Sequence, residues 1–393
     1  MKKRLAAGLP LVLTSLLALA SCQAWPESPD YARPLAPGAS ALLPLEASAE
    51  RPDLRAAFQD RRTLALPLEQ SIEWTRRESS KKYFPIAGIT HDRALRSLER
   101  FHELLHESSS HNQFQSAVVR EFEFYKSAGW DGEGGGVLFT GYYTPILEGS
   151  RWRSSEFKYP LYALPEDLVK GPGGEIRGQM TEAGVRPYPT RRTIEASGML
   201  QGRSLELVWL KDALDAYVAH VNGSAFVELE DGSLLRLGYA GKNGREYSSL
   251  GQALVLDGRL EPDQVSMATI REWMDRNPQL AQSYIGRNDS YVFFTSIDGN
   301  PRGSLNLEVM AERTLATDKS LFPRGALVFV DTVLPSAHGR QVPYKKLMLD
   351  QDTGGAIRTA GRADIYLGIG DEAEVRAGST RSPGQMIYMF LRE

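Results

Sequence analysis

The only cysteine of the chain, Cys22, directly follows an apolar run, and this placement limits how the protein can be stabilised. Lys2, Lys3 and Arg4 precede the run at 5–20, which is short for a membrane-spanning helix and has the charge pattern of a secretory signal. An exported chain with one cysteine has no internal disulfide. The fold must therefore depend on a hydrophobic core, for which 42% of the 393 residues are apolar.

The residues around this cysteine also indicate an anchor. Leu19-Ala-Ser-Cys22 is similar to a bacterial lipobox, in which the cysteine becomes the acylated first residue of the mature protein. We therefore expect a lipoprotein signal peptide over 1–21, lipidation of Cys22 and attachment to the membrane through this lipid. Gln23 follows the cysteine, which by similarity to other bacterial lipoproteins favours the periplasmic face of the outer membrane. The alternative is an ordinary signal peptide followed by an accidental cysteine.

Charge and length exclude some classes of protein. The 46 lysines and arginines are balanced by 49 aspartates and glutamates, so no basic field exists that could hold a polyanion. We expect no nucleic-acid partner. The length favours two domains, or one large domain that carries an insertion. The segment from Ala24 to about Ala49 is rich in Pro, Ala and Ser, which predicts a flexible tether over 22–50.

The rest of the chain is typical of helices followed mainly by strands. Apolar residues at helical spacing predict two or three helices within 54–125. The glycines at 131–136 end this pattern, and the apolar, aromatic stretch at 137–143 predicts a buried strand. Asp231-Gly232 lies between two β-prone runs and predicts a hairpin. We expect one more helix at 266–276, and further strands at 291–297, 326–330, 346–349, 364–367 and 385–391.

His102-Glu103-Leu-Leu-His106 has the spacing of a zinc-peptidase motif. Two histidines four residues apart on a helix can bind one zinc ion, while the glutamate between them polarises a water molecule. A third ligand is not evident, because His111 and the glutamates at 121 and 123 are poorly spaced. The histidines also lie beside the apolar stripe of the predicted helix, so they can equally border a packing surface.

A second group of candidate residues lies near the C-terminus. Asp352 precedes Thr-Gly-Gly, Asp364 begins the β-prone Ile-Tyr-Leu, and Asp318 precedes a turn and a strand. Three carboxylates next to sharp turns can meet in one cleft. Each aspartate can also simply accept hydrogen bonds from its own turn, as Asp commonly does.

These strings resemble the three-aspartate domain of the membrane-bound lytic murein transglycosylase A family. Further segments over 80–393 look like strings of the same family in the same order. The strings of the three-aspartate domain contain Asp318, Asp352-Thr-Gly-Gly-Ala-Ile357 and Arg362-Ala-Asp-Ile-Tyr366, and the further segments are Phe139-Thr-Gly-Tyr-Tyr-Thr-Pro145, Tyr188-Pro-Thr-Arg191, His220-Val-Asn-Gly-Ser224, Tyr239-Ala-Gly-Lys-Asn-Gly244, Asn288-Asp-Ser-Tyr-Val-Phe-Phe294 and Gly303-Ser-Leu305.

The resemblance implies a mainly β fold with N-terminal helices. Such enzymes are built around a double-psi β-barrel with a smaller inserted β domain, and the substrate lies in the groove between the two. We therefore expect the barrel and its helices to comprise 51–146 and 251–393, with the inserted domain at 147–250.

The resemblance also implies the reaction. Family members cleave the β-1,4 bond between N-acetylmuramic acid and N-acetylglucosamine in peptidoglycan and leave a 1,6-anhydromuramyl end. One acidic group suffices if it protonates the glycosidic oxygen and then accepts the proton of the C6 hydroxyl. By the family match this catalytic residue is Asp364. The residues that the resemblance implies for substrate binding are Asp352, Thr140, Tyr142, Tyr143 and Asp318.

The implied partners are peptidoglycan glycan strands, the membrane, and the machinery of cell-wall synthesis or division. No cofactor and no metal ion are implied. The string Arg358-Thr-Ala-Gly-Arg362 departs from the family, which more often carries a Lys-Gly turn there, and this leaves the shape of the loop open. Two other functions remain alternatives at this point: a non-catalytic peptidoglycan-binding lipoprotein of the outer membrane, and a zinc metallopeptidase that uses His102 and His106.

Overall fold

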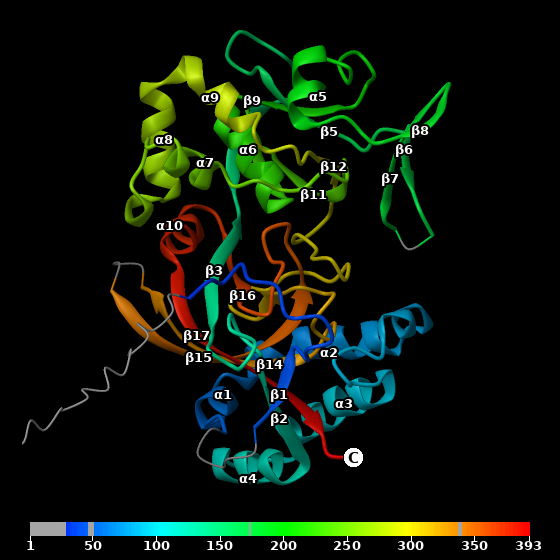
Figure 1. The fold of residues 1–393 in the computed structure, drawn as a ribbon, viewed down its shortest axis with the longest axis vertical. Coiled ribbons are helices and arrows are strands. Elements are labelled where there is room, and N and C mark those ends of the chain that lie inside the picture. Colours follow the sequence, from blue (N-terminus) through cyan, green and yellow to red (C-terminus); the bar gives the residue numbers. More distant parts are fainter. Residues whose placement is uncertain (1–28, 46–50, 173, 337–339) are drawn as a thin grey trace, which may run out of the picture.

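The computed structural model describes residues 29–45, 51–172, 174–336 and 340–393, whose path is shown in Figure 1. The predicted signal peptide and Cys22 lie outside these residues. Two large β-sheets contain most of the strands, and a three-stranded sheet flanks the second of them. Among the described residues, no helix has both the length and the apolar character needed to cross a membrane.

Four N-terminal helices cover the barrel side of the molecule (Figure 1). The helix α3 begins after Thr90, whose side chain accepts a hydrogen bond from the N–H of Arg93. Its apolar face is buried, with Leu98 and Phe101 packed in one cluster with Phe329 of the barrel. Burial of such a side chain contributes about 2 kcal/mol, so this face fixes the helix to the sheet. The helices are α1 (Arg55–Gln59), α2 (Arg61–Arg76), α3 (His91–Glu107) and α4 (His111–Glu121).

The first sheet closes into a six-stranded barrel. Neighbouring strands pair in the order β17-β14-β15-β13-β16-β3, and β17 pairs with β3 to complete the ring. A closed barrel has no free edge within the ring. Two further strands extend the sheet from β17, and α10 (Asp371–Ser379) packs against β3. The strands are β1 (Leu42–Pro44), β2 (Phe122–Ser127), β3 (Val137–Thr144), β13 (Thr314–Ala316), β14 (Leu327–Pro335), β15 (Gln341–Asp352), β16 (Arg362–Ile369) and β17 (Arg381–Leu391).

The second sheet has six strands and is joined to the barrel where β3 leads into β4 (Figure 1). The predicted hairpin at Asp231-Gly232 is confirmed, and Gly232 has the positive φ of 77° that its turn requires. The strands in this sheet are β4 (Ile146–Ser150), β5 (Tyr159–Tyr162), β9 (Glu206–Leu210), β10 (Ala225–Leu229), β11 (Leu234–Lys242) and β12 (Val292–Ser296), and those in the small sheet are β6 (Leu168–Lys170), β7 (Ile176–Thr181) and β8 (Gly184–Arg186).

Five helices accompany the second sheet. One of them, α8, begins at a capping box formed by Ser266 and Thr269, and it agrees with the helix predicted at 266–276. The helix α6 packs against α9 and against strands β5, β9 and β12. The helices are α5 (Arg191–Ser197), α6 (Ala213–Asn222), α7 (Leu250–Leu256), α8 (Met267–Arg276) and α9 (Pro278–Ile285).

The fold class expected from the sequence, a β-barrel with N-terminal helices and an inserted β domain, is confirmed. Two boundaries differ from the expectation. The strand β12 pairs with β11 of the second sheet, although the predicted boundary at 250 assigned its residues to the barrel. The strand β1 pairs with β2 and buries Leu42, although 22–50 was predicted to be a flexible tether. Apolar residues in a Pro-rich segment therefore add a strand to the barrel sheet.

Candidate active site

The candidate aspartates meet because two strands flank one residue of β13. Ala316 is opposite Asp352 in the parallel pair with β15 and opposite Asp364 in the antiparallel pair with β16. On the other side of β16, Asp364 is opposite Thr140 of β3. Adjacent strands lie about 4.8 Å apart, so these side chains belong to one small region of the barrel. The pairing unites residues that are up to 224 positions apart in sequence.

The carboxyl group of Asp364 is largely enclosed but reachable from solvent. Its side chain is 20% exposed, and the Thr140 hydroxyl donates a hydrogen bond to its Oδ1. Burial raises the pKa of Asp364, and the negative charge of Asp352 adds to this effect. Arg362, with Nη2 3.8 Å from Oδ1, and the Thr140 hydroxyl both oppose the rise in the pKa of Asp364 because they favour its charged form. Asp364 therefore combines a raised pKa with groups that stabilise its carboxylate.

Asp352 is held in place by three hydrogen bonds. Its Oδ1 accepts from the N–H groups of Ser304 and Thr353, each at 2.8 Å, and its Oδ2 accepts from the Tyr142 hydroxyl at 2.8 Å. Burial raises the pKa of Asp352, while these three donors act in the opposite direction. Residue 303 must be small, because a Cβ there would lie 2.9 Å from the carboxyl carbon of Asp352. Asp352 thus joins the loops around Ser304 and Thr353 to Tyr142 of β3.

Strand β3 sends its side chains to two different faces. Thr140 and Tyr142 lie on the face of the aspartates, where both form hydrogen bonds with them. Tyr143 points to the other face, is only 5% exposed and belongs to the hydrophobic core. Burial raises the pKa of its hydroxyl. Alternation along the strand thus places Tyr143 in the core, whereas the sequence predicted it beside Thr140 and Tyr142 at the substrate site.

Asp318 lies two residues beyond β13 and is buried. Its Oδ1 accepts hydrogen bonds from the N–H of Ser320 at 2.9 Å and from the Ser320 hydroxyl at 2.6 Å. The carboxyl group thus stabilises its own turn, and it forms no described contact with Asp352 or Asp364. This is the local hydrogen-bonding role that the sequence left open for each aspartate.

Three residues at the site were not selected from the sequence as candidates. Arg362 donates to the Thr140 hydroxyl at 3.1 Å and lies beside Asp364. Ser304 binds Asp352 through its backbone, and Tyr247 lies close enough to Asp364 for the carboxylate to raise the pKa of its hydroxyl, although burial is the larger cause. Arg362 and Ser304 stood in the quoted strings, so the signal was present, whereas Tyr247 lay outside them.

A buried ion pair lies behind the site. Lys319 contacts Asp350, and both are almost fully enclosed. Asp350 also accepts hydrogen bonds from the Thr317 hydroxyl and, at 2.8 Å, from the Tyr388 hydroxyl. Burial lowers the pKa of Lys319 and raises the pKa of Asp350, so each group needs the other to remain charged. This network joins β15, β17 and the turn after β13.

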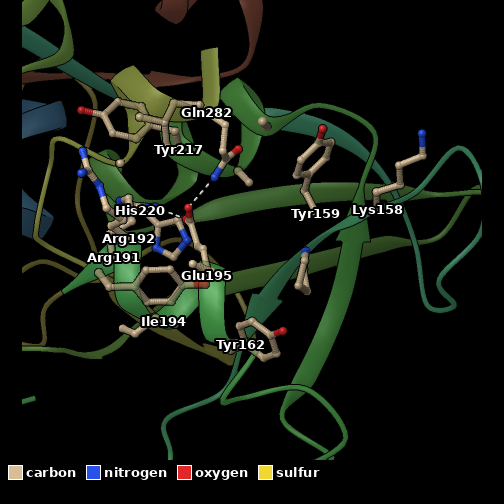
Figure 2. A pocket seen from close by; sticks show the side chains of 18 of the residues that line it. Lys158, Tyr159, Tyr162, Arg191, Arg192, Ile194, Glu195, Tyr217, His220 and Gln282 are labelled. Carbon is tan, nitrogen blue, oxygen red and sulfur yellow. Dashed lines mark hydrogen bonds and ion pairs between the residues drawn. The ribbon is translucent and has the colours of Figure 1, made fainter. Parts of the chain in front are cut away.

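A second feature is a cavity of about 350 Å³ lined by residues of α5, α6 and α9, and its lining includes none of the three candidate aspartates. Figure 2 shows that Gln282 donates to Glu195, and Arg191 also contacts this carboxyl group at 3.1 Å. Burial raises the pKa of Glu195 and lowers that of His220 well below its usual range, and His220 accepts from the N–H of Val292. These contacts tie α5 and α9 together and connect α6 with β12.

The predicted zinc motif lies entirely on the helix α3. The His102 and His106 rings are 4.5 Å apart between centroids, and Nδ1 of His106 donates to the carbonyl oxygen of His102 at 2.9 Å. Nε2 of His102 lies 3.5 Å from Glu69. Across the described ranges, no group of three His, Cys, Asp or Glu side chains is arranged to hold a metal ion. The motif therefore lacks a third ligand there, and its rings border the α3 packing face.

Two family models match the chain. The MltA specific insert domain matches residues 138–295, and the 3D domain matches residues 313–390. The first range begins in β3 and ends in β12, and the second contains all three candidate aspartates.

Two curated relatives carry the same name. Membrane-bound lytic murein transglycosylase A of Vibrio cholerae is 31% identical over 262 residues, which is 65% of this chain and 66% of that protein. The Escherichia coli protein of the same name is 33% identical over 258 residues, 63% of this chain and 65% of its own length. The alignments thus span just under two thirds of these relatives.

The structural matches cover more of the chain. A membrane-bound lytic murein transglycosylase from Agrobacterium tumefaciens has a TM-score of 0.74 at 26% identity, covering 90% of this chain and 98% of that one. E. coli MltA with bound chitohexaose has a TM-score of 0.68 at 24% identity, covering 90% and 96%. With both family models in their expected order on this fold, the chain belongs to the MltA family of membrane-bound lytic murein transglycosylases.

Proposed function

We propose that this chain cleaves the β-1,4 bond between N-acetylmuramic acid and N-acetylglucosamine in peptidoglycan and leaves a 1,6-anhydromuramyl end. The observation that carries this proposal is the environment of Asp364: one solvent-reachable carboxyl group whose pKa is raised by burial, beside a cation and a hydroxyl donor. The E. coli relative has been solved with chitohexaose bound, which fits a glycan substrate.

The proposed reaction uses Asp364 twice. In the first step the protonated carboxyl group donates its proton to the glycosidic oxygen as the bond to the anomeric carbon breaks. In the second step the C6 hydroxyl of the muramyl unit attacks this carbon, and its proton passes to the Asp364 carboxylate. Burial favours the protonated form needed first, and Arg362 and Thr140 stabilise the carboxylate formed between the steps. The acid is regenerated and no water is consumed.

Asp352 supports a lyase rather than a hydrolase assignment. Hydrolases place a second carboxyl group across the bond, where it activates water or forms a covalent intermediate. Here both oxygens of Asp352 already accept hydrogen bonds, from Tyr142 and from two backbone N–H groups. We assign it the roles of holding the loops and raising the pKa of Asp364. Thr140 and Tyr142 are the further residues proposed to contact substrate.

Digestion of purified peptidoglycan in ¹⁸O-labelled water tests the reaction. The expected products are anhydro-ended fragments that carry no label, because the ring closes from within the substrate. Labelled reducing ends would mean hydrolysis and contradict the proposal. Intact polymer that binds the protein would instead support the non-catalytic peptidoglycan-binding function.

We also propose that Cys22 carries a lipid that anchors the protein at the periplasmic face of the outer membrane, near the machinery of cell-wall synthesis or division. The names of the relatives support membrane attachment. Cys22→Ser should move the protein from the membrane fraction to the soluble periplasmic fraction. An unchanged distribution would contradict the anchor.

A further inference from the structure

A cavity of about 250 Å³ lies directly beside the loops that hold Asp352. One side is formed by Ser304 and Thr353, the two residues whose N–H groups bind the Asp352 carboxylate. The lining also includes residues from α2 and the 3-10 helix η2 (Glu78–Tyr83). The lining residues are Trp74, Ser79, Lys82, Tyr83, Ser304, Leu305, Lys319, Arg324 and Thr353. The cavity therefore adjoins the candidate active site.

Two cationic side chains of this cavity lie against the aromatic ring of Tyr83. The Arg324 guanidinium carbon lies 4.1 Å from the ring centroid, and Nζ of Lys82 lies 5.0 Å from it. Trp74 stacks on Tyr83 with ring centroids 6.0 Å apart. Stacking on an aromatic face orients the planar guanidinium and leaves its edge available for hydrogen bonds.

Among the residues that the structure describes, Arg324 has no anionic partner. Within the described ranges its single hydrogen bond runs from Nη1 to the backbone oxygen of Lys319 at 2.9 Å, and neither it nor Lys82 forms an ion pair. Burial lowers the pKa of Arg324, although Asp350 and Asp318 act against this from a distance. Both carboxylates are engaged elsewhere, Asp350 with Lys319 and Asp318 with its own turn. A half-buried arginine with free donors is a binding group for a carboxylate or phosphate.

We propose that this cavity binds a carboxylate of the peptide that substitutes the muramyl unit of the substrate. This inference rests on the proposed function, which supplies the polymer. The N-acetylglucosamine units are neutral, whereas the muramyl peptides carry free carboxylates. Arg324 would bind the carboxylate with two parallel N–H groups, and Lys82 would add a second positive charge at the mouth. The cavity would thus distinguish peptide-bearing glycan from bare or neutral glycan.

The test compares two forms of one substrate. Glycan strands that keep their peptides are used either as free acids or after conversion of the free carboxyl groups to amides. For the wild-type protein, kcat/KM should be about tenfold higher for the acid form, mainly through KM, as expected for one guanidinium–carboxylate pair in a half-exposed site. Arg324→Gln should bring this ratio close to one, and Arg324→Lys should restore part of it.

Lys81→Gln is the matched control, because Lys81 is the neighbour of Lys82 but is already paired with Glu78 at 2.7 Å. It should keep the wild-type ratio. An Arg324→Gln variant that loses the same factor on both substrates, or that keeps the wild-type ratio, would overturn the proposal. Thermal unfolding of both Arg324 variants separates misfolding from loss of binding.

Direct binding distinguishes failure of this inference from failure of the proposed reaction. A soluble disaccharide peptide should bind the wild-type protein in calorimetry about tenfold more tightly than its amidated form. This preference should weaken in Arg324→Gln even if neither protein cleaves the strands. Equal binding of the two forms by the wild-type protein would contradict the carboxylate site.

Discussion

Replacement of Asp352 by Asn tests the electrostatic relation between the two aspartates. Asn keeps an oxygen that accepts from Ser304 and Thr353, and its amide can donate to the Tyr142 oxygen, so the change removes a charge with little change of shape. Both aspartates flank Ala316 from adjacent strands, which places their backbones about 10 Å apart.

If the two carboxylate charges are separated by the same distance as the backbones, about 10 Å, they interact by about 1.7 kcal/mol at an effective permittivity of about 20. Salt screening over a Debye length of about 8 Å reduces the interaction to about 0.5–1 kcal/mol. Removal of the Asp352 charge therefore lowers the pKa of Asp364, because that charge is one of the causes of its rise. Because the protonated acid is required, activity is present below this pKa and is lost as the pH rises through it.

The alkaline limb of kcat/KM in Asp352→Asn should therefore move to lower pH. The assay is a pH profile of anhydro-end release from purified glycan strands, measured by mass spectrometry. Asp331→Asn on β14 is a matched control, since Asp331 pairs with Lys345 at 3.1 Å and β15 and β13 separate its strand from β16. An unchanged limb in Asp352→Asn, or one moved to higher pH, would mean that the Asp352 charge does not raise the pKa of Asp364.

Three further changes test other parts of the structure. Thr140→Val removes the hydrogen-bond donor that lowers the pKa of Asp364, so the same alkaline limb should move to higher pH, and an unchanged or lower limb would contradict the assigned hydrogen bond. Lys319→Met leaves Asp350 buried without its cation, so urea unfolding should show a loss of about 3 kcal/mol, whereas unchanged stability would mean that the pair is not needed. His102→Ala should leave the turnover per folded molecule and its insensitivity to chelators unchanged; zinc-dependent turnover that disappears in this variant would restore the metallopeptidase alternative.

Elements with strong local signals were predictable from the sequence. The strand at 137–143, the hairpin at Asp231-Gly232 and the helix that follows Ser266 all agree with the structure, because each depends on a local signal: an apolar, aromatic run, a turn glycine, or apolar residues on one helix face. Long-range pairing carries no such signal. The residues of β12 were correctly predicted to form a strand, but nothing in them indicates that β11 rather than a barrel strand is their partner.

The site was predictable only in part for the same reason. Asp352 and Asp364 stood out beside their turns and through the family resemblance, but their juxtaposition depends on the three-residue strand β13, which has no distinctive pattern. Tyr143 was assigned to the site although alternation along its own strand already separates it from Thr140 and Tyr142. For Tyr143, the family resemblance predicted a place at the site, whereas the alternation of side chains along a strand predicts the opposite face.

The proposed reaction requires that the carboxyl group of Asp364 both gives and takes back the proton. The most direct measurement is the rate at which Asp364→Asn releases anhydro-ended fragments from purified peptidoglycan, with binding to the polymer measured on the same preparation. We predict that the variant binds peptidoglycan as the wild-type protein does and releases less than about one hundredth as much product, because an amide can serve neither step. Turnover within a few-fold of the wild-type rate would contradict the account.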